Sequence, residues 1–241
     1  MKLYVVPVEN ECNATCPCCI TRFKKETEFG DRLDIKHLSK IKDLDIDEIE
    51  INGGGEPFMH KRIAEVISAC IDKAPTQVYT NGAFVVQRGA RLRNLLYLCL
   101  SRLHYDEKKN FKLMGVRYKP LDIQKLFAPI KMSLVLMKGG ISDARELRRY
   151  FRWANEIGAK AIVIRQMSDF DYPTDVQKRF VSSQKIFDDL CISDYENNEQ
   201  GNIIFRSKKM QVEVETKSVE EINPVMRADG NIYKGWSNQP Y

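Results

Sequence analysis

The chain has 241 residues and a formal net charge of +5 at pH 7, from 38 basic and 33 acidic side chains. This length fits one domain, or one domain with a modest extension. Hydrophobic residues make up 43% and charged residues 29%, a balance that is typical of soluble globular proteins and excludes the disordered and fibrous classes. No apolar run approaches the ~18–20 residues that a membrane-spanning helix needs, so we expect a cytoplasmic protein without a membrane partner. The small basic excess does not indicate nucleic-acid binding.

Short apolar runs alternate with helical patterns along the first two thirds of the chain, as they do in βαβ units. Strands are predicted at 3–8, 48–51, 77–79, 95–101, 130–137 and 161–164. Helices are predicted at 34–44, 60–72, 108–114 and 143–157. Ser142 is the predicted N-cap of the last helix, and Gly158 is its predicted stop. The pattern predicts a mostly parallel sheet with helices outside it.

The alternation of predicted strands and helices ends after Met167. A loop is predicted at 169–173, a helix at 176–190, and strands at 202–215 and 224–236, the last interrupted by a turn at 228–230. We therefore divide the chain into a core over residues 1–168 and an α+β extension over residues 169–241, which covers or flanks the core.

Four of the seven cysteines fall between residues 12 and 19, which in a reducing compartment indicates metal binding or catalysis rather than disulfides. Cys12, Cys16 and Cys19 follow the first strand with the spacing C-x3-C-x2-C. In parallel α/β folds, the carboxyl edge of the sheet is where ligands bind. Three thiolates can hold one face of an iron–sulfur cluster and leave a position open. The alternative, a closed zinc site, needs four ligands, usually in two separated pairs.

The other cysteines do not complete such a set. Cys18 is adjacent to Cys19, so the two thiolates are awkwardly placed to bind one cluster together. Cys70, Cys99 and Cys191 are isolated in the sequence. Cys70 and Cys99 lie on apolar faces and are predicted to be inert core thiols.

The segment 12–19 resembles the cluster loop of radical S-adenosylmethionine (SAM) enzymes. Three further features follow in that family's order. They are Gly54-Gly55-Glu56-Pro57 after the second strand, Thr80-Asn81-Gly82 after the third, and Ser101 at the end of the fourth. The resemblance covers residues 3–167.

The resemblance implies a partial (β/α)6 TIM-like barrel in which Cys12, Cys16 and Cys19 bind three irons of a [4Fe–4S] cluster. SAM would chelate the fourth iron and be cleaved to methionine and a 5′-deoxyadenosyl radical, which takes hydrogen from a small-molecule, nucleotide or peptide substrate. A flavodoxin or ferredoxin-type protein would donate the electron. The implied SAM-binding residues are Gly54, Gly55, Glu56, Pro57, Asn81, Ser101 and Arg165.

Several of these residues also have a structural interpretation. Glu56 suits a helix N-terminus, where a carboxylate is stabilised by the helix dipole. Asn81 suits an Asn-Gly turn. Ser101 can simply end a strand, and Arg165 can be a surface side chain that forms an ordinary ion pair.

The sequence also departs from the family. The position before the last cluster cysteine is usually aromatic, but here it is Cys18. The tail segment 227–233 resembles the strand that introduces an auxiliary-cluster cysteine in larger relatives. Gly235-Trp236 stands where that cysteine would fall, so no auxiliary cluster is expected. Arg206, Arg227, Tyr233 and Trp236 are candidates either to cover the substrate pocket or to pack within the tail's strands.

Three functions remain open from the sequence. The first is a radical SAM enzyme that acts on its own substrate. The second is an activase that installs a glycyl radical on a partner enzyme. The third is a non-catalytic module that binds zinc or an iron–sulfur cluster, although such a module has no need of the glycine-rich turn.

Overall fold

The computed structural model describes residues 1–23, 28–88, 92–124, 128–165, 173–190, 195–197, 202–207, 210–215 and 223–236. Of the predicted features, Cys191 and residues 169–172 of the expected loop lie outside the described residues.

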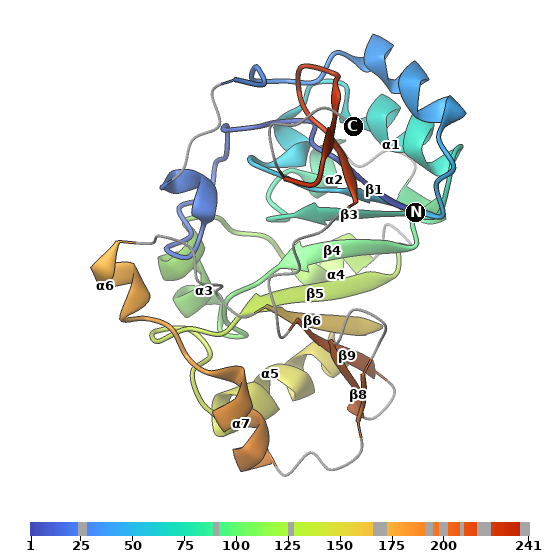
Figure 1. Ribbon diagram of the computed structural model, residues 1–241. Helices are drawn as coiled ribbons and strands as arrows, with labels where there is room; N and C mark the ends of the chain where they lie inside the picture. The colour runs from blue at the N-terminus through green and yellow to red at the C-terminus, as the bar shows by residue number, and fades with distance from the viewer. Residues whose placement is uncertain are drawn as a thin grey trace.

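The described residues form an α/β fold built on one sheet, in which β1 to β6 lie side by side in chain order and pair in parallel (Figure 1). These strands are β1 (Lys2–Val5), β2 (Glu48–Ile51), β3 (Thr76–Thr80), β4 (Tyr97–Ser101), β5 (Ile130–Val135) and β6 (Ala161–Arg165). The predicted parallel α/β class is therefore confirmed. The sheet is open, because its outermost strands, β11 and β7, lie at opposite ends of the strand order.

The tail adds strands at both edges of this sheet. At one edge, β9 (Met210–Glu215) runs parallel to β6, and β8 (Ile203–Ser207) and β7 (Glu196–Asn197) follow in antiparallel pairing. At the other edge, β10 (Pro224–Met226) runs parallel to β1, and β11 (Ile232–Lys234) pairs with β10 to form a hairpin. The tail therefore flanks both ends of the parallel core.

One face of the parallel strands is apolar and carries the core. Alternate residues of β1 to β6 point to this face and are fully buried, as strand geometry requires. They include Leu3, Val5, Ile49, Ile51, Val78, Leu98, Leu100, Met132, Leu134, Ile162 and Ile164. Burying each such side chain contributes roughly 1.5–3 kcal/mol, so this face is the main source of stability.

Five helices contribute buried side chains to this core: α1 (Ile63–Ile71), α2 (Val85–Arg88), α4 (Pro120–Gln124), α5 (Ala144–Glu156) and α7 (Ser183–Leu190). Two others, α3 (Glu107–Met114) and α6 (Thr174–Gln177), contribute Met114 and Val176 to a separate small cluster. Short 3₁₀ helices span Ile20–Arg22, Pro57–Met59 and Leu92–Asn94. In α5, Leu147, Tyr150, Phe151 and Ala154 are buried at helical spacing, and Gly158 follows with φ of 74°, which stops the helix as predicted.

Several predicted elements differ in detail. The segment 34–44 forms a 3₁₀ helix, Ile35–Asp43, rather than an α-helix. The single helix predicted at 176–190 is two helices, α6 and α7, and the strand predicted at 202–215 is the antiparallel pair β8 and β9. Among the described residues, no helix combines the length and apolarity that crossing a membrane requires.

The N-cap of α5 is Asp143 rather than the predicted Ser142. Asp143 has extended backbone angles, and its carboxylate accepts a hydrogen bond of 2.8 Å from the backbone N–H of Glu146. Two neighbouring residues are both suitable caps by type, and the start of the helix one residue later selects the second.

We predict that Asp143→Ala lowers the free energy of unfolding by about 1 kcal/mol, because it leaves a helix N-terminal donor without its acceptor. Ser142→Ala is the matched control and should change the value by less than about 0.5 kcal/mol. Chemical denaturation of both variants measures the difference, and equal effects would contradict the capping assignment.

Candidate functional site

The cysteines lie on the loop that leaves the carboxyl end of β1. We call residues 9–23 the cysteine loop. The side chain of Cys12 is exposed, and those of Cys16, Cys18 and Cys19 are partly buried. The backbone N–H of Cys19 donates to the carbonyl of Cys16 at 3.2 Å, which folds the end of the loop into a tight turn. All four thiols therefore lie at the edge of the sheet where parallel α/β folds bind ligands.

The thiols influence one another electrostatically. Burial raises the pKa of Cys12, and a thiolate at Cys19 raises it further. Burial also raises the pKa of Cys16, with added contributions from charges at Cys18, Cys19 and Cys12. Burial is the main cause of both shifts, and the smaller contributions from neighbouring thiolates mean that a positive group beside the loop would stabilise the charged forms.

Cys18 lies in an apolar setting. Together with Cys16, it packs against the small cluster formed by Leu103, Met114 and Val116. Burial, followed by the charge of Cys19, raises the pKa of Cys18 to about 12. Cys18 therefore occupies an apolar packing position, which is the environment expected where the family has an aromatic residue.

The glycine-rich turn after β2 packs backbone to backbone against the cysteine loop. A Cβ added at Gly54 would lie 1.9 Å from the carbonyl oxygen of Glu9, and one at Gly55 would lie 2.3 Å from that of Glu11. In addition, the N–H of Glu56 donates to the carbonyl of Glu11 at 2.9 Å. The close approach that requires these glycines is therefore to the cysteine loop itself, whereas the sequence suggested an approach to a ligand.

Glu56 is a buried carboxylate, 2% exposed, that joins the ends of β2 and β3. It accepts hydrogen bonds from the N–H of Phe58 at 3.0 Å, the hydroxyl of Thr80 at 2.5 Å and the N–H of Asn81 at 2.7 Å. Burial nevertheless raises its pKa above the ordinary value. The carboxylate also caps the 3₁₀ helix that begins at Pro57, so its contacts match the helix N-terminal interpretation.

Asn81 reaches from the end of β3 to the cysteine loop. Its Nδ2 lies 2.7 Å from Asn13 Oδ1 and 3.8 Å from Cys12 Sγ, and its Oδ1 accepts from the N–H of Ala83 at 3.0 Å. Asn81 therefore supports the turn and contacts the loop at the same time. Ser101 ends β4, half-buried, and its carbonyl accepts from the hydroxyl of Tyr118.

Arg165 lies at the end of β6 and is held by carboxylates rather than facing an open site. Its Nε is 3.0 Å from Glu215 Oε2, its Nη2 is 3.8 Å from Glu50 Oε1, and its guanidinium lies 4.5 Å from the centre of the Tyr79 ring. Arg165 would have to leave these partners to bind an external carboxylate.

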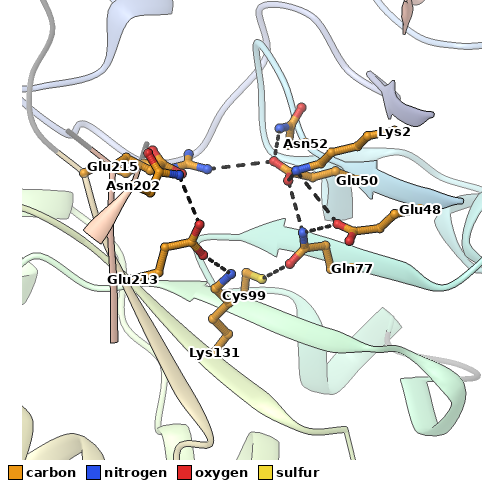
Figure 2. A network of polar contacts seen from close by, with 11 residues as sticks. Lys2, Glu48, Glu50, Asn52, Gln77, Cys99, Lys131, Asn202, Glu213 and Glu215 are labelled. Atoms are coloured by element: carbon orange, nitrogen blue, oxygen red, sulfur yellow. Dashed lines mark hydrogen bonds and ion pairs between the residues drawn. The ribbon is translucent and has the colours of Figure 1, made fainter. Parts of the chain in front are cut away.

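Arg165 belongs to a polar network on the face of the sheet opposite the main core, which we call the inner face (Figure 2). Glu50 is at its centre: its carboxylate oxygens lie 2.7 Å from Lys2 Nζ, 2.5 Å from Asn52 Nδ2 and 3.2 Å from Gln77 Nε2. Farther along, Lys131 pairs with Glu213 at 3.3 Å. The alternation of Glu48 and Glu50 with isoleucines in β2 signals this polar face in the sequence, but our sequence analysis did not use it.

The predicted site residues fall into two groups, one around the cysteine loop and one in the tail. The structure brings the cysteines, the Gly54–Pro57 turn and Asn81 together around one loop. Of the tail candidates, Arg227, Tyr233 and Trp236 lie in or beside the β10–β11 hairpin next to β1, whereas Arg206 is on β8 at the other end of the strand order. They therefore do not line one pocket together.

The chain is similar to several known proteins. No family model matches the chain. A curated protein of Pyrococcus horikoshii, described as a probable GTP 3′,8-cyclase, is 26% identical over 186 residues, covering 71% of this chain and 57% of that protein. The crystal structure of Streptococcus suis SuiB bound to S-adenosylmethionine is similar with a TM-score of 0.59 at 22% identity, covering 75% of this chain and 43% of that one. The structure of TYW1 with a lysine-pyruvate adduct bound has a TM-score of 0.55 at 14% identity, covering 85% and 75%.

These likenesses are to radical SAM proteins. Radical SAM proteins are enzymes that use a [4Fe–4S] cluster and SAM. The chain spans little more than half the length of its curated relative. The structural likeness, at 14–22% identity, describes the radical SAM fold alone.

The donor set of the cysteine loop fits such a cluster. Within the ranges that the structure describes, no three Cys, His, Asp or Glu side chains are close enough together to hold a single metal ion. A [4Fe–4S] cluster binds each thiolate through a different iron and so needs the sulfurs spread around a larger body. Three soft thiolates on one short loop are suitable ligands for such a cluster.

We predict that Gly54→Ala destabilises the protein by about 2 kcal/mol or more, because its Cβ would overlap the backbone of Glu9. Gly140→Ala is the control, since an added Cβ there lies 3.1 Å from its nearest neighbours. Chemical denaturation of the metal-free variants measures the effect. A Gly54→Ala variant as stable as Gly140→Ala would contradict the described packing.

Proposed function

We propose that the chain is a radical SAM enzyme that binds a [4Fe–4S] cluster through Cys12, Cys16 and Cys19 and cleaves SAM reductively to generate a 5′-deoxyadenosyl radical. The observation that carries the proposal is the direct packing of the cysteine loop on the Gly54–Pro57 turn at the carboxyl edge of the sheet. When bound, the cluster supplies the electron that breaks a C–S bond of SAM, and the radical then abstracts hydrogen from the substrate.

In this proposal the protein's own residues bind and orient. The three thiolates would hold the cluster and leave one iron open to SAM. The turn residues Gly54, Gly55, Glu56 and Pro57, with Asn81 and Ser101, line the side on which SAM would lie. Glu56 would stabilise this surface without binding SAM through its carboxylate, because the carboxylate already accepts hydrogen bonds from two backbone N–H groups and from the hydroxyl of Thr80. Arg165 would join them only by releasing Glu215.

We further propose that residues 1–168 form a partial (β/α)6 barrel and that residues 169–241 flank it. The chain-order arrangement of β1 to β6 supports the barrel. The substrate would then lie over the inner face, where Glu50, Arg165 and Glu215 offer both signs of charge. One relative is named as a GTP cyclase and a solved SuiB structure contains a precursor peptide, so a nucleotide, a peptide and a small molecule all remain within the proposed substrate class.

An electron donor would reach the cysteine loop beside α3. The N–H of Thr15 donates to the carbonyl of Met114 at 2.7 Å, which fixes the loop on the end of this helix. The helix and the segment after it expose five basic side chains: Lys108, Lys109, Lys112, Arg117 and Lys119. This surface suits an acidic partner such as a flavodoxin or ferredoxin, because complementary charge speeds encounter.

Two other functions are weaker alternatives. A glycyl-radical activase would share the SAM chemistry but need a partner enzyme for turnover. A non-catalytic zinc or iron–sulfur module has no use for the turn that packs on the cysteine loop.

We predict that the anaerobically reconstituted, dithionite-reduced protein converts SAM to 5′-deoxyadenosine and that Cys16→Ala abolishes this product by removing a cluster ligand. Cys18→Ala is the matched control: it should keep the cluster and the product, because Cys18 packs against the same apolar cluster as Cys16 but is not one of the three proposed ligands. Chromatography of the products and iron analysis measure both effects.

Two results would refute the proposal. A fully loaded wild-type cluster that yields no 5′-deoxyadenosine would exclude both radical SAM functions. Product from Cys16→Ala would exclude the ligand assignment. If 5′-deoxyadenosine forms but substrate turnover requires a second protein, the activase replaces the stand-alone enzyme.

We predict that a Lys108→Glu/Lys112→Glu variant is reduced by flavodoxin about tenfold more slowly at low salt, because reversed charges impair encounter with an acidic partner. The matched control is Arg145→Glu/Arg152→Glu on the exposed side of α5. Reduction by dithionite should be unchanged in both variants. Equal slowing by the two variants, or none, would exclude α3 as the docking surface.

A further inference from the structure

One arginine of the tail hairpin is buried between two aromatic rings. Arg227 follows β10, and its guanidinium carbon lies 4.3 Å from the centre of the Phe29 ring and 5.0 Å from that of Trp236. Cation–π contacts of this kind strengthen when the pair is shielded from water. The guanidinium is therefore held against two aromatic rings.

The charge of Arg227 is matched by Glu9, which is fully buried. Arg227 Nη1 lies 3.2 Å from Glu9 Oε2, and the backbone N–H of Ala228 donates to Glu9 Oε1 at 3.4 Å. Removing one member of a buried ion pair leaves the other charge without compensation. The pair therefore connects the hairpin to the cysteine loop through a buried ion pair, unlike an exposed ion pair, which contributes little to stability.

These contacts connect the hairpin to the first residue of the cysteine loop, Glu9, and to Phe29, which follows the loop in the chain. Glu9 precedes Cys12 by three residues, whereas Phe29 lies on the segment that returns from the loop. The two segments also pair with each other, since the N–H of Glu9 donates to the carbonyl of Asp31 at 3.1 Å. Glu9 in turn is the residue whose carbonyl lies against Gly54. Figure 1 shows the red hairpin beside the blue segments that follow β1.

We propose that Arg227 is a positioning residue that holds Glu9, at the start of the cysteine loop, against Phe29 and so sets the position of the cluster-binding thiols. The proposal rests on the proposed function of that loop. Arg227 acts through Glu9 and Phe29 and does not itself touch the cluster. A lysine in its place would keep a charge for Glu9, but its ammonium group cannot stack flat between two rings.

The test compares Arg227→Met with Arg102→Met. Arg102 is a matched control, because it is also buried and lies between two rings, Tyr118 at 5.3 Å and Trp153 at 5.1 Å, but donates to the carbonyl of His104 rather than to the cysteine loop. Both variants remove a buried, stacked guanidinium, so a general loss of stability affects both. Arg227→Lys and Glu9→Gln separate the stacking from the charge.

Three measurements report on the loop. They are the alkylation rate of Cys12 in the iron-free protein, the rate of iron release to a chelator from the reconstituted protein, and the electron paramagnetic resonance spectrum of the reduced cluster. In Arg227→Met, we expect alkylation and iron release to rise about tenfold, the lower end of the effect of losing an outer-shell partner, and the spectrum to change. Arg227→Lys and Glu9→Gln should shift the same quantities by less, and Arg102→Met should leave them as in the wild type.

The proposal is overturned if Arg102→Met changes these quantities as much as Arg227→Met does, or if Arg227→Met matches the wild type. Because the alkylation comparison needs no cluster, it decides the positioning role even if the wild type produces no 5′-deoxyadenosine. That last result would contradict the proposed function alone.

Discussion

The candidate site depends on one steric constraint, the contact between two backbone segments at the carboxyl edge of the sheet. The turn after β2 approaches the cysteine loop so closely that Gly54 and Gly55 have no room for a Cβ. The contact fixes the loop that carries the thiols against the strand ends, and the hydrogen bond from Glu56 to the carbonyl of Glu11 keeps it in register. Interiors packed this closely transmit displacement rather than absorb it, so the positions of Cys12 and its neighbours follow from the path of this turn.

Buried charge is the second organising feature. Glu9, Glu50 and Glu56 are each almost entirely excluded from water, and each is surrounded by donors. An unpartnered buried carboxylate would cost several kcal/mol, which the surrounding hydrogen bonds and cations offset. The three carboxylates have different roles: Glu56 connects two strand ends, Glu9 connects the tail hairpin to the cysteine loop, and Glu50 is the centre of the polar inner face.

Local patterns predicted most of the core and only part of the site. The strand at 48–51 has the predicted bounds, because its alternation and the flanking turn residues are both local signals. The segment 176–190 was predicted as one helix, because the apolar residues Val176, Ile186 and Phe187 suit a single helical face. In the structure the helix is interrupted, and the segment forms α6 and α7. The Arg227–Glu9 pair joins residues 218 positions apart. A contact between such distant residues cannot be predicted from local sequence patterns. The cofactor roles of Ser101 and Arg165 remain predictions.

The pairing of β1 with β10 has a consequence for how the protein matures. These strands lie at residues 2–5 and 224–226, so one edge of the sheet closes only after almost the whole described chain has been synthesised. Contacts this distant in sequence form late, because loop closure costs entropy before the contact is made. During translation, β1 is an exposed sheet edge, and Glu9 and Phe29 lack the hairpin that contacts them. In the proposed function, a cluster would therefore meet the fully ordered loop only after the hairpin has been synthesised.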